Sequence, residues 1–240
     1  QRALRIGLVP LVWQAPDPAA TLGAYAGLYL QQEVQAEALV RQIGDFARFL
    51  EVISFSQASQ LNLAALAREA EIPRKRAESY LDILDDLLLS FRLPVFQRRA
   101  QRQLVQHQKL YLFDAGVFRS LRPRGPLDAP AEGDGLALEG LVAQHLRAFC
   151  QLRPGGAILS FWRTRSGLEV DFVVYGPELF WAIEVKRNNR IDRRDLKGLK
   201  AFAADYPEAQ CLLLSLCSEP LVIDGIRCEP LEQWLKQLRP

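Results

Sequence analysis

Two apolar runs separated by a Gly-Pro turn place the strongest limit on what this chain can fold into. Residues 168–175 and 179–186 are both rich in branched and aromatic side chains, so the sequence predicts two consecutive strands with a short connection. Four charged residues interrupt the two runs: Glu169, Asp171, Glu184 and Lys186. Because side chains alternate between the faces of a strand, the two acids of the first run share a face, and so do the two charges of the second.

Charged side chains in strands that otherwise look buried need partners, a metal ion or water, because an unpaired buried charge is strongly unfavourable. One explanation is an ion pair between Lys186 and a carboxylate at the edge of a sheet. The other is a divalent-cation site with a lysine beside it. Mg²⁺ prefers carboxylate oxygen ligands, and a neighbouring ammonium group can position an attacking water or stabilise a pentavalent phosphate.

The second half of the chain alternates between helical and strand patterns in an order typical of a mixed sheet covered by helices. The predicted elements are a helix at 136–150, strands at 158–163, 168–175 and 179–187, a helix at about 192–206, and strands at 211–217 and 221–226. We therefore expect an α/β domain with a mixed central sheet over residues 136–240.

The first half is predominantly helical. Apolar residues at three- and four-residue spacings predict helices at 20–35 and 44–55. A helix from about Asn62, a break at Ile72-Pro73 and a second helix follow, and strand patterns at 91–97 and 108–114 come next. This order predicts a helix-turn-helix with a wing.

The composition between these parts suggests domain limits. Residues 120–135 are rich in proline and glycine without an apolar period, so we expect an exposed linker there. The expected fold class is α+β, with a helical segment at 1–56, a winged helix-turn-helix at 57–119, the linker, and the α/β domain at 136–240.

Charge and cysteine usage limit the class of protein further. The net charge is only +2, but seven Lys or Arg and one acid lie between Arg98 and Arg124, so positive charge is concentrated locally. The four cysteines lack metal-binding spacing and no signal peptide or membrane-spanning run is visible, which favours a cytoplasmic protein without a membrane partner. The chain contains no methionine and begins at Gln1, so we expect it to be a piece of a longer protein.

The order of a helix, Asp171 and then Glu184-Val185-Lys186 resembles the PD-(D/E)XK nuclease superfamily, the restriction-endonuclease-like fold. The resemblance implies that Asp171 and Glu184 hold Mg²⁺ or Mn²⁺, that Glu139 in the preceding helix assists as a further metal ligand, and that Lys186 serves the nucleophile. Asp171, Glu184 and Lys186 would then be the catalytic residues. The chain departs from the namesake motif at Val170, where that motif has proline.

Four segments, "KLYLFDAGV", "LEGLVAQHL", "FWRTRSGLEVDFVV" and "AIEVKRN", resemble the C-terminal half of a prokaryotic family of AAA-type ATPases of unknown function. In that family a P-loop module precedes a winged helix and a nuclease-like domain. The resemblance implies that ATP binds only in the missing N-terminal portion, since no Gly-Lys pair occurs in these 240 residues. Its own ATPase module would then be a partner, and oligomers would be possible because AAA modules commonly form rings.

Basic residues near these elements are candidates for nucleic-acid binding. They are Arg74, Lys75, Arg76, Arg98, Arg99, Arg163, Arg187, Arg193 and Lys197. Acids follow on the would-be recognition helix and would repel phosphates, and the helical face at Arg193 and Lys197 could equally be an ordinary solvated surface. Two hypotheses stay open: a metal-dependent phosphodiesterase acting on nucleic acid, or a catalytically inactive nuclease-like module for DNA binding or protein–protein regulation of the ATPase.

Overall fold

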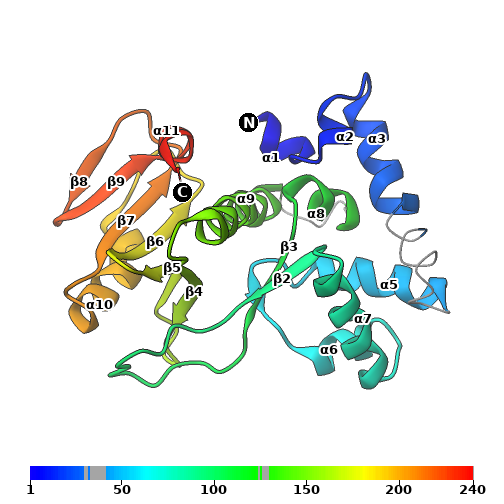
Figure 1. The fold of residues 1–240 in the computed structure, drawn as a ribbon, viewed down its shortest axis with the longest axis horizontal. Coiled ribbons are helices and arrows are strands. Elements are labelled where there is room, and N and C mark those ends of the chain that lie inside the picture. The colour runs from blue at the N-terminus through cyan, green and yellow to red at the C-terminus, as the bar shows by residue number, and fades with distance from the viewer. Residues whose placement is uncertain (30–31, 33–41, 124, 126–129, 240) are drawn as a thin grey trace. The chain divides into compact units, whose positions relative to one another are not determined.

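The computed structural model describes residues 1–29, 32, 42–123, 125 and 130–239, and it has a mixed α+β architecture with two compact units (Figure 1). The first unit comprises Gln1–Arg92 and Leu110–Leu141, and the second comprises Leu93–Lys109 and Val142–Pro240. The chain therefore enters the second unit, returns to the first and enters the second again. Among the described helices, none is both long enough and apolar enough to cross a membrane.

The first unit is built mainly from short helices. Its elements are α1 (Arg2–Ile6), α2 (Pro10–Trp13), α3 (Pro18–Ala24), the π-helix η1 (Tyr25–Tyr29), α5 (Ile43–Ser54), β1 (Ser59–Gln60), α6 (Leu63–Glu69), α7 (Arg74–Asp86), β2 (Ser90–Leu93), β3 (Lys109–Leu112) and α8 (Ala115–Leu121). The strands form a small sheet in the order β1-β3-β2. The predicted helices at 44–55 and after Asn62 are confirmed, whereas much of the second half of the helix predicted at 20–35 lies outside the described residues.

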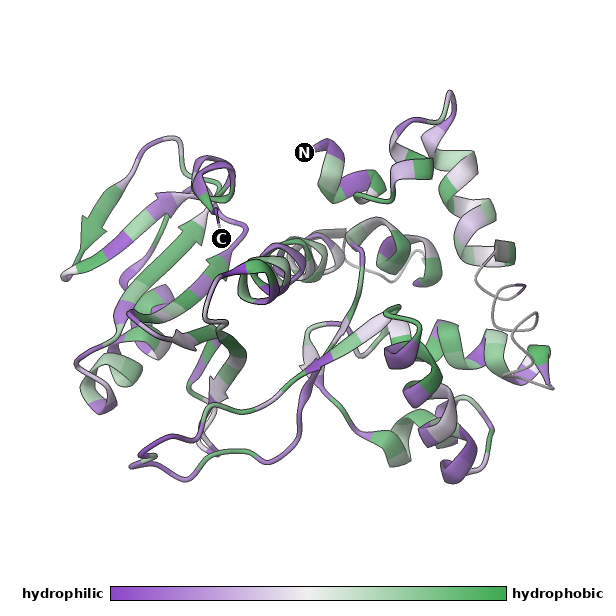
Figure 2. Ribbon diagram, in the orientation of Figure 1, coloured by the Kyte–Doolittle hydropathy of each residue, from purple (hydrophilic) through white to green (hydrophobic). Residues whose placement is uncertain are grey.

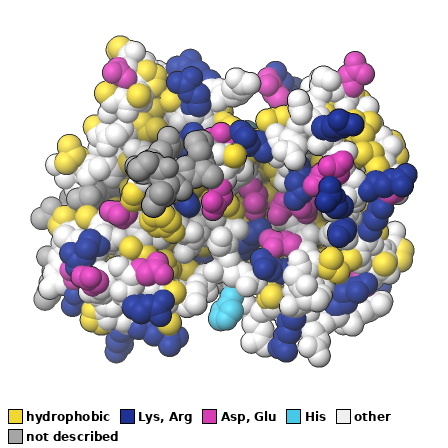
Figure 3. Space-filling view, turned by 180° about the vertical axis from the view of Figure 1, so that it is seen from behind, with side chains coloured by type: hydrophobic (Ala, Val, Ile, Leu, Met, Phe, Trp, Pro, Cys, Tyr) yellow, Lys and Arg dark blue, Asp and Glu magenta, His cyan; other side chains and the backbone are white. Residues whose placement is uncertain are grey.

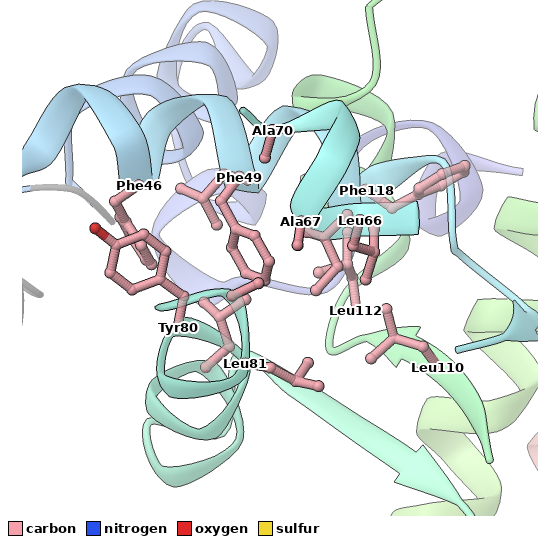
Figure 4. Close-up of a cluster of buried hydrophobic side chains, with 14 of the residues drawn as sticks. Phe46, Phe49, Leu66, Ala67, Ala70, Tyr80, Leu81, Leu110, Leu112 and Phe118 are labelled. Carbon is pink, nitrogen blue, oxygen red and sulfur yellow. The ribbon is translucent and has the colours of Figure 1, made fainter. Parts of the chain in front are cut away.

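The core of the first unit follows the apolar spacing of its helices (Figure 4). Phe46 and Phe49 on α5 are fully buried and meet the ring of Tyr80 on α7 edge-on, with ring centroids 5.2 and 5.6 Å apart. Leu66 on α6 and Leu112 on β3 belong to the same cluster. Buried aromatic and aliphatic side chains each contribute roughly 1.5–3 kcal/mol, so this cluster explains why such short helices are stable.

The second unit contains a six-stranded sheet in the order β4-β5-β6-β7-β9-β8. The strands are β4 (Ile158–Arg163), β5 (Glu169–Gly176), β6 (Leu179–Lys186), β7 (Gln210–Ser215), β8 (Leu221–Ile223) and β9 (Ile226–Pro230). β4, β5 and β6 run antiparallel, while β7 is parallel to β6 and to β9, so the predicted mixed sheet is confirmed. The central strands are largely hydrophobic, as expected for strands buried on both faces (Figure 2).

Helices complete the second unit. The long helix α9 (Pro130–Leu152) begins in the first unit and ends in the second. The 3₁₀ turn η2 (Arg193–Leu196) leads into α10 (Lys197–Asp205), whose Leu199 and Phe202 are buried, and α11 (Leu231–Gln237) follows β9. The helix predicted at about 192–206 is thus present, whereas α11 is an additional element.

Two expectations of local structure were wrong. The single strand expected at 221–226 is a hairpin of β8 and β9, because Asp224 and Gly225 both adopt positive φ, 49° and 80°, and turn the chain back. The segment expected to be a loop, 120–135, contains the end of α8 and, from Pro130, the first residues of α9. Proline suits the first position of a helix, so its presence there did not exclude one.

The connection between β2 and β3 runs beside β4 and forms part of the second unit (Figure 1). Phe96 N donates to Phe161 O at 2.7 Å, and Phe161 N donates to Pro94 O at 3.0 Å. On the return, Val105 N donates to Arg163 O at 3.1 Å. The edge of the sheet at β4 is therefore paired with residues 93–109, the segment in which a wing was expected.

Candidate active site

Asp171 on β5 and Glu184 on β6 form a pair of buried carboxylates on neighbouring strands. Phe172 pairs with Ile183 across the antiparallel ladder, and continuing that register by one residue sets Asp171 opposite Glu184. Both acids are only 7% exposed. The sequence prediction that these two acids gather at one place is consistent with this register.

A backbone hydrogen bond holds the Asp171 side chain. Its Oδ2 accepts the N–H of Val185 at 2.9 Å. Among the described pairs, Phe172 and Ile183 are the last in the β5–β6 ladder. The Asp171 carboxylate therefore satisfies a backbone N–H that lies beyond the end of the ladder. The side chain is thereby fixed, and its Oδ1 is left to face the rest of the site.

Glu184 has one satisfied and one unsatisfied carboxylate oxygen. Its Oε1 accepts a hydrogen bond from Lys186 Nζ at 2.6 Å, whereas its Oε2 is buried and has no hydrogen-bond partner among the described residues. A buried carboxylate oxygen without a donor is costly, because the water it lost on folding is not replaced. This oxygen is the clearest sign in the described structure that a further group belongs here.

The surroundings of the site raise the pKa values of both Glu184 and Lys186, but for different reasons. Burial raises the pKa of the Glu184 carboxyl well above its ordinary value and the charge of Asp171 raises it further, although Lys186 and Lys109 oppose the change. Burial alone would lower the pKa of Lys186, but Glu184, Asp171 and Asp195 outweigh burial and raise it. Lys186 therefore stays an ammonium group at neutral pH, while Glu184 keeps its proton to a higher pH than an exposed glutamate.

A second set of ion pairs adjoins the carboxylates. Lys109 is a buried lysine whose Nζ lies 2.6 Å from Glu169 Oε1 and 3.5 Å from Asp171 Oδ1. Arg163 on β4 contacts the other oxygen of Glu169 at 2.8 Å. Sequence reasoning did not assign Lys109 to the site, although a lysine inside the apolar strand pattern at 108–114 was a signal of the same kind as Lys186.

Glycine at position 198 allows α10 to approach this part of the sheet closely. A Cβ built on Gly198 would lie 1.8 Å from the carbonyl oxygen of Glu169, a backbone atom that cannot yield easily. Ahead of this residue, the side chains of Asp192 and Asp195 form a reciprocal capping box on η2. The sequence thus fixes both the start of this helical segment and its distance from β5.

Glu139, predicted as a third metal ligand, lies on α9 in the first unit. There its Oε1 accepts a hydrogen bond from the hydroxyl of Tyr111 at 2.6 Å. Within the described part of the chain, no group of three or more His, Cys, Asp or Glu side chains is arranged so as to hold a metal ion. The pair of Asp171 and Glu184 supplies two carboxylates, and the assignment of Glu139 to the same metal ion stays a prediction.

The basic residues predicted to bind nucleic acid in the first unit differ in their surroundings. Arg74 and Lys75 are exposed in the first turn of α7, whereas Arg76 forms an ion pair with Asp45 at 2.5 Å. The acid Asp85, farther along α7, is paired with Arg92 at 2.6 Å. Part of the negative charge on this helix is therefore compensated within the unit.

Arginines of the segment 93–109 are bound to other residues of the second unit. Arg98 lies over the ring of Tyr175, 4.7 Å from its centroid, and Arg99 is 3.4 Å from Glu208. Arg102 forms an ion pair with the buried Asp205 at 2.8 Å. Contacts of this kind fasten the segment to the unit, whatever further role the cations have.

The basic face of η2 and α10 is solvent-exposed, as predicted. Arg193 and Lys197 point outward, while Leu196 and Leu199 are buried. Arg193 lies 3.6 Å from Asp224, and Lys200 pairs with the same acid. Arg187 is also exposed. On the face shown in Figure 3, the described lysines and arginines are spread among acidic and apolar side chains rather than gathered in one patch.

Fold and site together define an α+β chain with two compact units. The second unit carries, on neighbouring strands of a mixed sheet, a buried pair of carboxylates and an adjacent lysine. Residues 1–128, more than half of the chain, match the model of a domain of unknown function (DUF8612), and the chain belongs to that family. Residues 134–234 match a second domain of unknown function (DUF4143), which is found in AAA-ATPase-associated proteins. Comparisons with curated proteins and with solved structures gave no match.

Proposed function

We propose that this chain is the C-terminal region of an AAA-type ATPase whose second unit is a PD-(D/E)XK nuclease-like domain, a divalent-metal-dependent phosphodiesterase acting on nucleic acid. The observation that carries the proposal is the buried Glu184 Oε2, which has no hydrogen-bond partner among the described residues and belongs to a carboxylate opposite Asp171. A hard divalent cation is the kind of group that such an oxygen binds.

The carboxylates and the lysine of the site have separate tasks in this proposal. Asp171 and Glu184 would hold Mg²⁺ or Mn²⁺, with Glu139 as the further ligand that the family resemblance implies. When bound, the cation would lower the pKa of a water molecule and polarise the phosphate. The ammonium group of Lys186, held 2.6 Å from Glu184, would orient the attacking water and stabilise negative charge on the phosphate oxygens.

The first unit supports delivery to nucleic acid. Helices α6 and α7 are joined by the four residues 70–73 and are followed by β2 and β3 of the three-stranded β1-β3-β2 sheet, an order that supports a helix-turn-helix with a wing, although the connection between β2 and β3 belongs to the second unit. Arg74 and Lys75 are exposed at the start of α7, where base or phosphate contacts are usually made. The match to a domain of AAA-ATPase-associated proteins supports an ATPase module as the partner.

A second candidate function is a nuclease-like module without turnover, which binds DNA or regulates the ATPase. The ion pairs of the site favour it, because Lys186 compensates Glu184 while Lys109 and Arg163 compensate Glu169 and Asp171. Acids that are matched by fixed cations can be structural in a protein that no longer binds metal.

A cleavage assay separates the two candidates. The chain is incubated with plasmid DNA, linear DNA and RNA in the presence of Mn²⁺ or Mg²⁺, beside Asp171→Asn and Lys186→Ala. We expect cleavage by the wild type to fall by at least roughly 100-fold in both variants, since each removes a group that acts on the reacting atoms. Asp205→Asn is the matched control, because Asp205 is a buried, ion-paired acid of the same unit away from the site.

Two outcomes would contradict the enzyme proposal. Cleavage that persists in both variants would come from a contaminant. Absence of cleavage with every substrate and metal, with the wild type folded, would favour the regulatory module.

A further inference from the structure

The contacts of the site form an array of two ion-paired groups, Arg163–Glu169–Lys109–Asp171 and Glu184–Lys186, which meet at the carboxylates of Asp171 and Glu184. Three carboxylates, Glu169, Asp171 and Glu184, contact three cationic side chains, Lys109, Arg163 and Lys186. When all six are ionised, their formal charges cancel, and Asp195 also acts on Lys186. A divalent cation added beside Asp171 would place further positive charge next to the buried Lys109, which is unfavourable.

Lys109 is the cationic side chain that a bound metal ion would repel most strongly. Asp171 Oδ2 accepts a hydrogen bond from the Val185 N–H, so Oδ1 is the oxygen that can bind a cation. The ammonium nitrogen of Lys109 lies 3.5 Å from that oxygen, and its side chain is only 3% exposed. A metal ion on Oδ1 would therefore lie within a few ångströms of a buried positive charge with little water to screen it.

A bound phosphodiester offsets the repulsion between the metal ion and Lys109, because its negative charge can face both of them. We propose that Lys109 is a positioning residue that makes metal binding depend on phosphate: it is the counter-ion of Asp171 in the free chain, and the divalent cation enters together with the phosphodiester of the substrate. This inference rests on the proposed function, since it uses the same pair of carboxylates. It adds that the site is in effect selective for a metal–phosphate pair over either ion alone.

Direct measurement of Mn²⁺ binding tests the proposal without relying on turnover. The complete 240-residue chain is titrated with Mn²⁺ while the electron paramagnetic resonance signal of the free ion is followed, with and without a short phosphorothioate DNA oligonucleotide. The Mn²⁺ bound by the oligonucleotide alone is subtracted. We expect the oligonucleotide to tighten Mn²⁺ binding to the wild type by at least about tenfold, the size of a moderate coupling between two ligands.

Lys109→Met removes the charge and keeps the length of the side chain. In this variant Mn²⁺ alone should bind at least about tenfold more tightly than to the wild type, and the oligonucleotide should add little, because the repulsion is gone. Lys200→Met is the matched control, since Lys200 is an ion-paired lysine of the same unit whose partner is Asp224. Its Mn²⁺ affinity should equal that of the wild type.

The double variant Lys109→Met with Glu169→Gln covers the case in which the single variant does not fold, because it also removes the charge of the acid that Lys109 contacts at 2.6 Å. The same gain in Mn²⁺ affinity is expected. Equal affinity in the wild type and the Lys109 variants, or weaker binding in the variants, would overturn the inference while leaving the metal site in place. Absence of Mn²⁺ binding to every form, with Asp171→Asn no different, would overturn the proposed function itself.

Discussion

At the scale of single residues, burial of the carboxylates of Asp171 and Glu184 lowers the stability of the folded chain. Two carboxylates that are each 7% exposed lie opposite one another, and one oxygen of Glu184 has no hydrogen-bond partner in the part of the chain that the structure describes. A well-packed apolar pair at these positions would be more favourable for stability. Such a cost is common where a chain binds a cation or a substrate, because function there requires charge that folding alone does not.

The raised pKa of Glu184 gives a pH dependence whose sign is fixed. The folded chain binds the Glu184 proton more tightly than the unfolded chain does, so the stabilisation is complete below the ordinary glutamate pKa and is lost as the pH rises through the raised pKa. We expect the free energy of unfolding in urea to fall over this range. Glu184→Gln should reduce the fall, and each pKa unit corresponds to about 1.4 kcal/mol.

The exposed Glu208 supplies the control for this measurement. Glu208→Gln should leave the fall unchanged, because the side chain is more than half exposed. If Glu184→Gln and the wild type lost stability over the same range and by the same amount, Glu184 would not be the group that titrates.

At the scale of elements, the site depends on how closely α10 packs on β5. The absence of a side chain at Gly198 permits a backbone-to-backbone approach at Glu169, the residue that also pairs with Lys109 and Arg163. The helix therefore acts as a support for one end of the strand that carries Asp171. Any widening at this point should change the site as well as the packing.

Gly198→Ala tests this support. The added Cβ would lie 1.8 Å from Glu169 O, so α10 or β5 must shift, and we expect a loss of about 1–3 kcal/mol in the free energy of unfolding. Gly133→Ala on α9 is the comparison, because no atom lies within 4 Å of the added Cβ and alanine favours helix, which predicts a gain of about 0.5–1 kcal/mol. Equal effects of the two substitutions in urea unfolding would show that the contact at Gly198 is not limiting.

The sequence predicted the strands of the second unit well because their apolar runs are long and bounded by turn residues. The Glu184-x-Lys186 spacing also predicted one side of the site, since strand alternation alone brings these two side chains together. Lys109 was missed although a lysine within an apolar strand pattern is a signal, because Glu169, which it contacts, lies sixty residues away and no local pattern showed which carboxylate it would meet. The hairpin at Asp224-Gly225 was missed although an Asp-Gly pair is a strong turn signal, because the two short strands were taken as one.

At the scale of the whole molecule, the chain passes between its two units three times, after residues 92, 109 and 141. The excursion from 93 to 109 covers the edge of the sheet at β4 and delivers Lys109 to the carboxylates. The second unit therefore draws its residues from two separate stretches of sequence, and a fragment that begins after residue 109 lacks the first of them.

A fragment of residues 136–240 should show what the excursion contributes. This fragment retains the six strands but loses Lys109 and the pairing along β4, so we expect a lower midpoint of unfolding and a stronger tendency to aggregate than for the complete chain. Adding a synthetic peptide of residues 93–109 should raise the midpoint as its concentration increases. A fragment as stable as the complete chain, and indifferent to the peptide, would show that the covered edge is dispensable.

The pairing of residues 93–109 with β4 also has a consequence for biosynthesis. Phe96, which belongs to the aromatic cluster of the second unit, leaves the ribosome several seconds before Phe161, at ordinary rates of elongation. During that interval an apolar stretch of the nascent chain lacks its native partner. It can then form non-native contacts with the helices that were synthesised before it. Translation speed between these two points, and the chaperones that attend it, should therefore influence how much of this protein reaches its native state.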